Sequence, residues 1–187
     1  MQDVSKAFKV GKMIYTNLPN DEIKGKSVAI VGNAKSLFYY NYGNEIDNAD
    51  VVIRFNKGFI TDNNAQGTKT DFLFLACDLS YSEIQSYKPR YVINRSIKYK
   101  NKADYTFMQK YRFVLKQIIG SQPSTGFMAI HWCIKANAKQ ITLYGFDFGE
   151  TPTFYNPVDY KTPHNYEKEK ELVLGYKQAG LLTVKGA

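Results

Sequence analysis

The chain is poor in residues that bind metals or form disulfides. Its 187 residues include only two histidines and two cysteines, and none of its ten aspartates belongs to an Asp-x-Asp pair, by which many nucleotide-sugar enzymes hold a divalent ion. The cysteines, Cys77 and Cys133, have neither metal-site spacing nor the density of a disulfide scaffold. The sequence therefore predicts two buried thiols and no metal site.

Long apolar runs are also missing. No segment approaches the roughly 20 apolar residues of a membrane-spanning helix. Residues 1–12 lack the apolar block of a signal peptide. We therefore expect a soluble protein.

Positive charge is present in excess. The 25 Lys and Arg residues outnumber the 17 Asp and Glu residues, which gives a formal net charge of +8. Such a charge attracts anions, whether nucleotides, nucleic acids or acidic lipid headgroups. The lysines are scattered instead of alternating with aromatic residues in an arginine-rich run, and this disfavours nucleic acid as the partner. A peripheral contact with an anionic membrane stays open.

The order of apolar segments predicts the fold class. With 44% hydrophobic residues the chain can enclose one substantial core. Apolar and β-branched segments alternate with helical patterns, which predicts an α/β fold, a Rossmann-like single domain with a mainly parallel sheet covered by helices. Residues 27–187 would form this domain, and residues 1–26 an N-terminal extension packed on it. Strands are expected at 27–31, 51–55, 72–76, 91–94, 141–146 and 181–184, and helices at 35–40, 81–86, 106–119, 126–136 and 166–178.

The first segment with a chemical signal is the end of the strand at 27–31. Gly32, Asn33 and Ala34 follow an apolar run there. Such a strand end places backbone amides and the Asn33 side chain at the carboxyl edge of the sheet, where open α/β folds bind ligands. The segment lacks GxGxxG, so the dinucleotide fingerprint is not satisfied. Taken alone, Gly32-Asn33 is also typical of an ordinary turn.

A second signal lies at Gln122-Pro123-Ser124-Thr125-Gly126. Ser124 and Thr125 are favoured helix N-caps, Pro123 prevents an earlier start, and Gly126 lets a ligand approach the backbone. A helix that begins here would offer free amides and hydroxyls to an anion. An ordinary helix cap explains the pattern equally well.

The third signal is His164, in a chain with one other histidine. A neutral imidazole can accept a hydroxyl proton at physiological pH, and Glu169, five residues on, could orient the ring or stabilise the imidazolium. A lone surface histidine is more often inert. His131, between Ile130 and Trp132 in a helical pattern, is interpreted as structural.

These segments, in this order, resemble the sialylmotifs of glycosyltransferase family 29. Residues 31–59, from Val-Gly-Asn to Arg-x-Asn-Lys-Gly-Phe, are similar to the large motif. Residues 123–146 resemble the small motif, with Pro-Ser-Thr-Gly at one end and Leu-Tyr-Gly-Phe at the other. His164 and Glu169 match the His-x4-Glu of the very small motif. The resemblance spans about residues 27–172, and the three motifs together are far more specific than any one of them.

The resemblance implies a sialyltransferase-type variant of the GT-A fold and an inverting, metal-independent transfer from CMP-sialic acid, or a related CMP-sugar, to a glycan hydroxyl. His164 would deprotonate the acceptor, with Glu169 beside it. Asn33 and Asn56 would hold the CMP phosphate, ribose or base. No cofactor is implied. By resemblance, the donor site comprises Gly32, Asn33, Ala34, Asn56, Ser124, Thr125, Gly126, Gly145, Phe146 and Tyr155.

The chain departs from the family pattern in two places. The animal enzymes have a disulfide between positions that here lie near Val28 and Ala138; these should adjoin in the fold, but neither is a cysteine. Its absence points to a reducing compartment, hence to a cytoplasmic, bacterial or phage-encoded enzyme, peripheral at the inner face of a bacterial membrane. The family also has a motif, called the third motif, in which a histidine precedes aromatic residues. Thr153-Phe154-Tyr155 has the aromatic residues without the histidine, so the role of that histidine would fall to Tyr155, to a lysine or to no residue.

Three alternatives stay open at this point. The donor could be CMP-Kdo, used in lipopolysaccharide or capsule assembly. A non-catalytic CMP-sugar binding module would explain the missing third-motif histidine, although such a module needs no base at position 164. A nucleic-acid module would require basic and aromatic residues on one exposed sheet face, which the buried strands do not offer.

Overall fold

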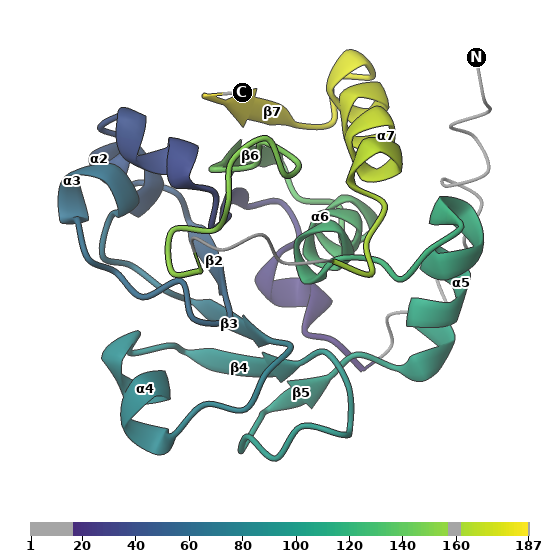
Figure 1. The fold of residues 1–187 in the computed structure, drawn as a ribbon, viewed down its shortest axis with the longest axis horizontal. Helices are drawn as coiled ribbons and strands as arrows, with labels where there is room; N and C mark the ends of the chain where they lie inside the picture. Colours follow the sequence, from purple (N-terminus) through teal and green to yellow (C-terminus); the bar gives the residue numbers. More distant parts are fainter. Residues whose placement is uncertain (1–16, 157–161, 187) are drawn as a thin grey trace.

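The computed structural model describes residues 17–156 and 162–186, and its centre is one sheet of seven strands (Figure 1). Every pair of neighbouring strands is parallel, and the order is β5-β4-β3-β2-β1-β6-β7. The α/β fold with a parallel sheet, expected from the sequence, is confirmed. The strands are β1 (Ser27–Val31), β2 (Val51–Phe55), β3 (Phe72–Leu75), β4 (Tyr91–Asn94), β5 (Tyr105–Thr106), β6 (Gln140–Tyr144) and β7 (Thr183–Lys185).

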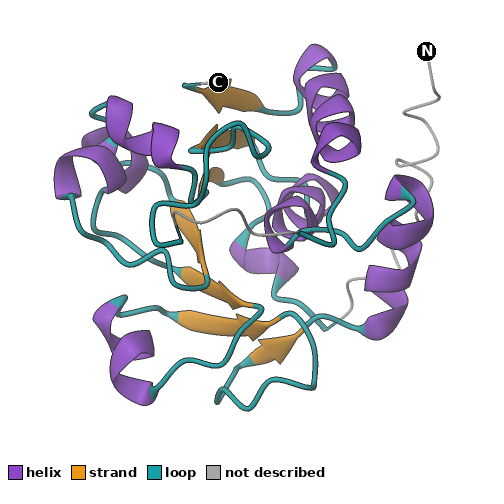
Figure 2. Ribbon diagram, viewed as in Figure 1, coloured by secondary structure: helices purple, strands orange, loops and turns teal. Residues whose placement is uncertain are grey.

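Helices cover both faces of the sheet (Figures 1 and 2). On one face, the main core joins the sheet to the longer helices, and Trp132 and Tyr111 lie within it. On the other face, smaller clusters form around Ile46 and Ile84. The helices are η2 (Asn20–Glu22), η3 (Lys35–Tyr39), α2 (Gly43–Asp47), α3 (Asn63–Gln66), α4 (Tyr81–Ser86), α5 (Gln109–Ile119), α6 (Thr125–Lys135) and α7 (Tyr166–Gln178).

Alternation along β1 explains how one strand serves both cores. Val28 and Ile30 pack into the main core, whereas Ala29 and Val31 pack into the cluster around Ile46. Successive strand residues point to opposite faces, so a strand covered on both sides must be apolar at every position. This is the physical reason that the continuous run of apolar residues at 28–31 predicted a buried strand.

The differences from the predicted elements concern short segments. Tyr105 and Thr106 form the edge strand β5, which the sequence had assigned in part to a helix. The extended backbone of Met108 delays the start of α5 to Gln109. Helices α2 and α3, and the 3-10 helix η2, were missed because each is too short to show a helical period. The expected helix at 35–40 is the 3-10 helix η3.

The pairing of β1 with β6 confirms the expected proximity of Val28 and Ala138. Val28 lies opposite Ile141, and the Lys139 amide donates to the Lys26 carbonyl at 2.8 Å. The two regions that the family joins covalently are thus joined here by a strand ladder.

Residues 17–26 contact the domain through both apolar and polar groups. Ile23 is buried, Trp132 Nε1 donates to Asn20 Oδ1 at 2.8 Å, and the Arg90 guanidinium donates to both carboxylate oxygens of Glu22 at 2.9 Å. Residues 1–16 lie outside the described residues, so the predicted N-terminal extension over 1–26 stays a prediction. Among the described helices, none is long and apolar enough to cross a bilayer.

Arg54, part of the large motif, is a structural residue. Its side chain is only 2% exposed, and its guanidinium donates to the carbonyls of Lys69 and Gln66 and to Thr70 Oγ1. Burial lowers the pKa of Arg54 to about 10, and the nearby Asp47 carboxylate opposes that shift. The arginine therefore holds the segment before β3 against β2 and is not available to a ligand.

Candidate active site

A cavity of about 800 Å³ lies at the carboxyl ends of the strands. The strand order reverses at β1, since the chain builds β2 to β5 on one side of it and β6 and β7 on the other. Open α/β sheets bind ligands outside the carboxyl ends at such a switch point. Every residue predicted for the site lines this cavity: Gly32, Asn33, Ala34, Asn56, Ser124, Thr125, Gly126, Gly145, Phe146, Tyr155, His164 and Glu169.

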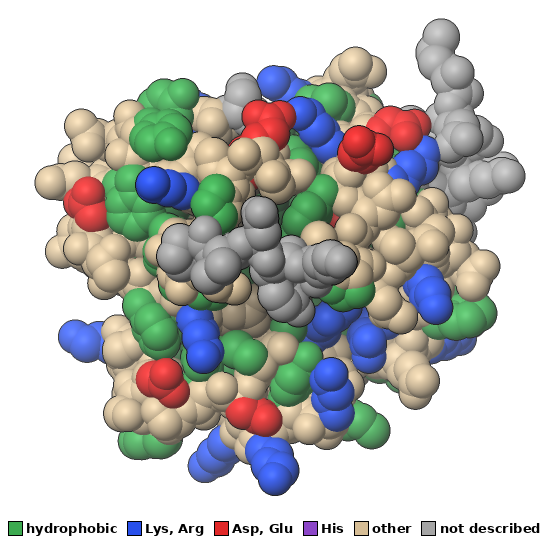
Figure 3. All heavy atoms as spheres, in the orientation of Figure 1, with side chains coloured by type: hydrophobic (Ala, Val, Ile, Leu, Met, Phe, Trp, Pro, Cys, Tyr) green, Lys and Arg blue, Asp and Glu red, His purple; other side chains and the backbone are tan. Residues whose placement is uncertain are grey.

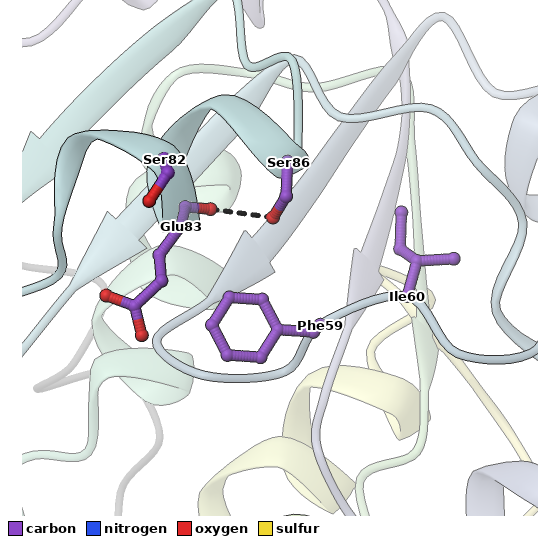
Figure 4. Close-up of a pocket in the computed structure, with 5 residues that line it drawn as sticks. All are labelled: Phe59, Ile60, Ser82, Glu83 and Ser86. Carbon is purple, nitrogen blue, oxygen red and sulfur yellow. Dashed lines mark hydrogen bonds between the residues drawn. The ribbon is translucent and has the colours of Figure 1, made fainter.

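A smaller hollow of about 420 Å³ lies beside α4 (Figure 4). Its polar groups serve the helix itself, because Glu83 forms a capping box with Ser80 and Ser86 Oγ donates to the Glu83 carbonyl at 2.7 Å. Ser82, Phe59 and Ile60 supply the rest of its lining. We therefore assign the candidate site to the larger cavity.

Two glycines bring the ends of β1 and β6 together. The Gly32 amide donates to the Tyr144 carbonyl at 2.7 Å, and a Cβ atom on Gly32 would lie 2.3 Å from the Gly145 carbonyl oxygen. Gly145 itself has a φ of 64°, which favours glycine. The close packing of these two backbone turns thus requires both glycines, whether or not a ligand also approaches them.

The two asparagines are fixed by different contacts. Asn33 Nδ2 donates to the Phe55 carbonyl at 3.0 Å, and the Asn33 side chain lies close to the Tyr155 hydroxyl. Asn56 has a φ of 51°, and its Oδ1 accepts from the Ala76 amide at 2.7 Å. Within the described parts of the chain, Asn56 Nδ2 makes no hydrogen bond, so it is the donor left for a ligand.

A carboxylate of the protein itself caps the start of α6. Ser124 donates to Glu169 twice at 2.6 Å, from its amide to Oε1 and from its hydroxyl to Oε2, and its hydroxyl oxygen accepts from the Phe127 amide. Both donors of Ser124 are thereby engaged. The next two amides, of Thr125 and Gly126, have no partner within the helix. An anion in the cavity would therefore meet the amides of Thr125 and Gly126 before Ser124.

His164 is held by a backbone carbonyl and not by Glu169, contrary to the pairing expected from the sequence. Its Nδ1 lies 2.8 Å from the Gln122 carbonyl oxygen. A carbonyl can only accept, so in the neutral ring Nδ1 carries the proton and Nε2 keeps a free lone pair. The structure thus selects the tautomer that a general base at Nε2 requires.

Burial shifts the pKa values of both residues. It lowers the pKa of His164 below its usual 6.5, with a further decrease from the Arg95 cation and an opposing effect of the bond to Gln122. It raises the pKa of Glu169 to about 7, although the bonds from Ser124 favour the charged form. At neutral pH His164 is unprotonated, and Glu169 holds a proton more readily than an ordinary carboxyl group.

Three cations of the cavity were not identified from the sequence. Lys57, Arg95 and Lys98 line it, and Arg95 Nη2 donates to the Pro123 carbonyl at 2.8 Å. A signal for Arg95 was available, because it directly follows the strand 91–94, whose carboxyl end lies at the same edge of the sheet as that of β1. The acids of the cavity are engaged: Asp147 accepts from Ser36 and Thr151, and Glu150 pairs with Lys170.

The segment around Tyr155 closes one side of the cavity against the end of β1. The Phe154 amide donates to the Asn33 carbonyl at 3.0 Å, and Thr153 forms a bridge with Ala34. Burial raises the pKa of Tyr155, so the phenol stays protonated at physiological pH. Over residues 17–156 and 162–186, no group of three or more His, Cys, Asp or Glu side chains could hold a metal ion.

Comparison with known proteins gives a consistent result. The sequence profile of glycosyltransferase family 29 (sialyltransferase) matches residues 1–113. A mammalian sialyltransferase superposes with a TM-score of 0.67 at 15% identity, over 100% of this chain and 80% of that chain. The monofunctional α-2,3-sialyltransferase Cst-I from Campylobacter jejuni gives 0.60 at 14% identity, over 86% and 74%. CstII from Campylobacter jejuni, in complex with cytidine-5′-monophosphate, gives 0.56 at 16%, over 86% and 80%. No curated protein sequence matches the chain.

Proposed function

Because the chain belongs to glycosyltransferase family 29, the sialyltransferases, we propose that it transfers sialic acid, or a related keto-sugar acid, from its CMP ester to a hydroxyl of a glycan acceptor. The observation that carries this proposal is the state of His164, whose bond to the Gln122 carbonyl leaves Nε2 as a base in the cavity. The neighbours support the choice of substrates. One of them was solved with CMP and another, mammalian, with the glycan derivative Gal-β-1,3-GalNAc-ortho-nitrophenol.

The proposed reaction is a single displacement with inversion. The acceptor hydroxyl passes its proton to His164 Nε2 while its oxygen bonds to the anomeric carbon. The bond from that carbon to the phosphate oxygen breaks, and CMP leaves with the electron pair. Four hydrogen-bond donors of the cavity would stabilise the leaving phosphate: Asn56 Nδ2, the amides of Thr125 and Gly126, and the Lys57 ammonium.

Charge in the cavity supports a metal-free mechanism. A CMP ester carries one phosphate, and the cavity offers helix N-terminal amides together with the Lys57 ammonium. These groups can offset the charge that develops on the leaving group, which is the part a divalent ion plays for a diphosphate. Tyr155 lies in the segment that corresponds to the third motif, and its protonated hydroxyl is the group there that could assist the departing phosphate in place of the histidine.

A panel of nucleotides with and without EDTA tests the donor. We expect CMP and CMP-sialic acid to raise the melting temperature, because a ligand at about 100 times its Kd adds about 2.7 kcal/mol to the stability of the folded state. UDP, GDP and their sugars should have little effect, and chelation should change nothing. Stabilisation by UDP or GDP instead, or loss of the CMP effect in EDTA, would contradict the proposal.

CMP-Kdo is the alternative donor, since it shares the nucleotide, the carboxylate and the tertiary anomeric centre, and the same panel can include it. A binding module without turnover is disfavoured by the free Nε2 of His164.

We also propose that the enzyme works in the cytoplasm beside an anionic membrane. The support is the exposed Ile97, which lies in a loop with the exposed Lys98, Lys100 and Lys102. Sedimentation with anionic and neutral vesicles would test that contact.

A further inference from the structure

We propose that Arg95 and Lys98 form an anion subsite at the acceptor end of the cavity, so that the glycan acceptor carries an acidic group, a carboxylate or a phosphate. This inference rests on the proposed function, because it assigns the acceptor to a cavity that also holds a CMP-sugar. It adds the chemical class of the acceptor and two residues that select it.

Arg95 and Lys98 lie away from the β1–β6 switch point, on the side of the cavity where Arg95 contacts the segment before α6. The switch point lies between β1 and β6, where Gly32 and Gly145 meet. Arg95 follows β4, three strands away from β1 in the sheet. Neighbouring strands are about 4.8 Å apart, so the two strand ends are separated by roughly 14 Å. Lys57, one strand away from β1, is the cation that lies near the donor.

Arg95 lies on the side of the cavity that holds the proposed base. It donates to the carbonyl of Pro123, and the carbonyl of the preceding residue, Gln122, holds the His164 ring. The acceptor hydroxyl must approach His164 Nε2 to lose its proton. A group on the same acceptor would therefore come within reach of Arg95 and its neighbour Lys98.

The Glu169 carboxyl, which Ser124 already engages, attracts Arg95 electrostatically but does not pair with it. In the described parts of the chain, neither Arg95 nor Lys98 forms an ion pair with a carboxylate, and Arg95 Nε is buried without a hydrogen-bond partner. Buried guanidinium groups are normally paired, because an unsatisfied charged donor is costly. Arg112 lies near enough to Arg95 to repel it electrostatically, which adds to the demand for an anion.

The loop after β4 presents the two cations together. Tyr99 lies close enough to Arg95 to favour its charged form, and the Lys98 ammonium lies 4.9 Å from the centre of the Tyr99 ring. Lys and Arg side chains gather on this β4–β5 side of the molecule in the space-filling view (Figure 3). An acidic group on the acceptor would thus meet a guanidinium held by the Pro123 carbonyl and an exposed ammonium at the rim.

Two acceptors that differ by one acidic sugar test the subsite, namely lactose and sialyllactose. We expect the wild type, saturated with CMP, to bind sialyllactose at least tenfold more tightly than lactose in titration calorimetry. Arg95→Gln should lose at least tenfold in affinity and in kcat/KM for sialyllactose, and the exposed Lys98→Gln about threefold. Transfer to lactose and the affinity for CMP should stay within about twofold in Lys98→Gln. Lys100→Gln, which removes the same charge from the same loop outside the cavity, is the matched control and should behave as the wild type.

Each other outcome has a distinct meaning. No preference of the wild type for the acidic glycan, or equal losses on both acceptors in Lys98→Gln, would overturn the subsite. A rise in the Kd for CMP-sialic acid in both variants would move the cations to the donor. Failure of CMP to bind the wild type at all would instead remove the proposed function, and calorimetry with the glycans alone would still show whether Arg95 and Lys98 bind an acid. A lactose phosphate, compared with sialyllactose, distinguishes a phosphate from a carboxylate.

Discussion

Replacing His164 by alanine is expected to lower kcat by about 10²- to 10⁴-fold, the usual contribution of a positioned acid or base. The imidazole touches the acceptor hydroxyl in the proposed reaction, whereas the CMP moiety is held by other groups. The affinity for CMP should therefore stay nearly unchanged. Steady-state kinetics at saturating donor, together with the shift in melting temperature that CMP causes, measures both quantities.

The pH profile of the wild type gives a second readout of the same residue. Burial and Arg95 lower the pKa of His164 below 6.5, so the imidazole is protonated only in acid, and activity should fall as the pH drops below 6.5. In His164→Ala this limb should disappear from the residual rate. A variant that transfers sugar at nearly the wild-type rate would remove His164 as the base. Loss of CMP affinity would place it in the donor site instead.

Replacing Glu169 by alanine is expected to destabilise the fold. The carboxylate is only 2% exposed and accepts two hydrogen bonds from Ser124 at the start of α6. Each buried donor left without a partner costs about 1–3 kcal/mol, so the loss of both should lower the free energy of unfolding by roughly 2–6 kcal/mol. Ser124→Ala is the matched comparison, because it removes the hydroxyl but keeps the amide bond to Glu169, and it should lose about 1 kcal/mol. Urea unfolding at pH 7 measures all three proteins.

Glu169→Gln separates the charge of this residue from its packing. The carboxyl has a pKa of about 7 in the folded protein against an ordinary value of 4.5. The folded state therefore holds a proton that the unfolded chain has lost, and the wild type should lose stability as the pH rises from about 4.5 to about 7, by about 3 kcal/mol at most. The amide variant cannot titrate, so its stability relative to the wild type should increase between pH 5 and pH 8. Parallel stability curves would show that Glu169 is charged throughout.

The sequence predicted the sheet better than the contacts of the site. Residues 28–31 are apolar at every position, and only a strand covered on both faces requires that. By contrast, β5 has two residues, Tyr105 and Thr106, which gave no period of their own and merged with the helical pattern that follows. Patterns thus located the long buried elements and missed those that are defined by a few backbone bonds.

The same limit applies to the candidate site. The residues at strand and helix ends could be predicted, because parallel strands bring their carboxyl ends to one edge. The partner of Glu169 could not, since Ser124 is 45 positions away in sequence and the pairing depends on how α7 packs against α6. Spacing suggested His164, but its ring is held by the Gln122 carbonyl, a backbone group with no sequence signal.

The most direct test of the central claim is the transfer reaction itself. Wild-type protein would be incubated with CMP-sialic acid, a glycan acceptor and EDTA, and the products followed by proton NMR. The account predicts equal amounts of free CMP and of a new sialoside whose anomeric configuration is opposite to that of the donor. A product of retained configuration, or CMP released only by hydrolysis with every acceptor offered, would contradict it.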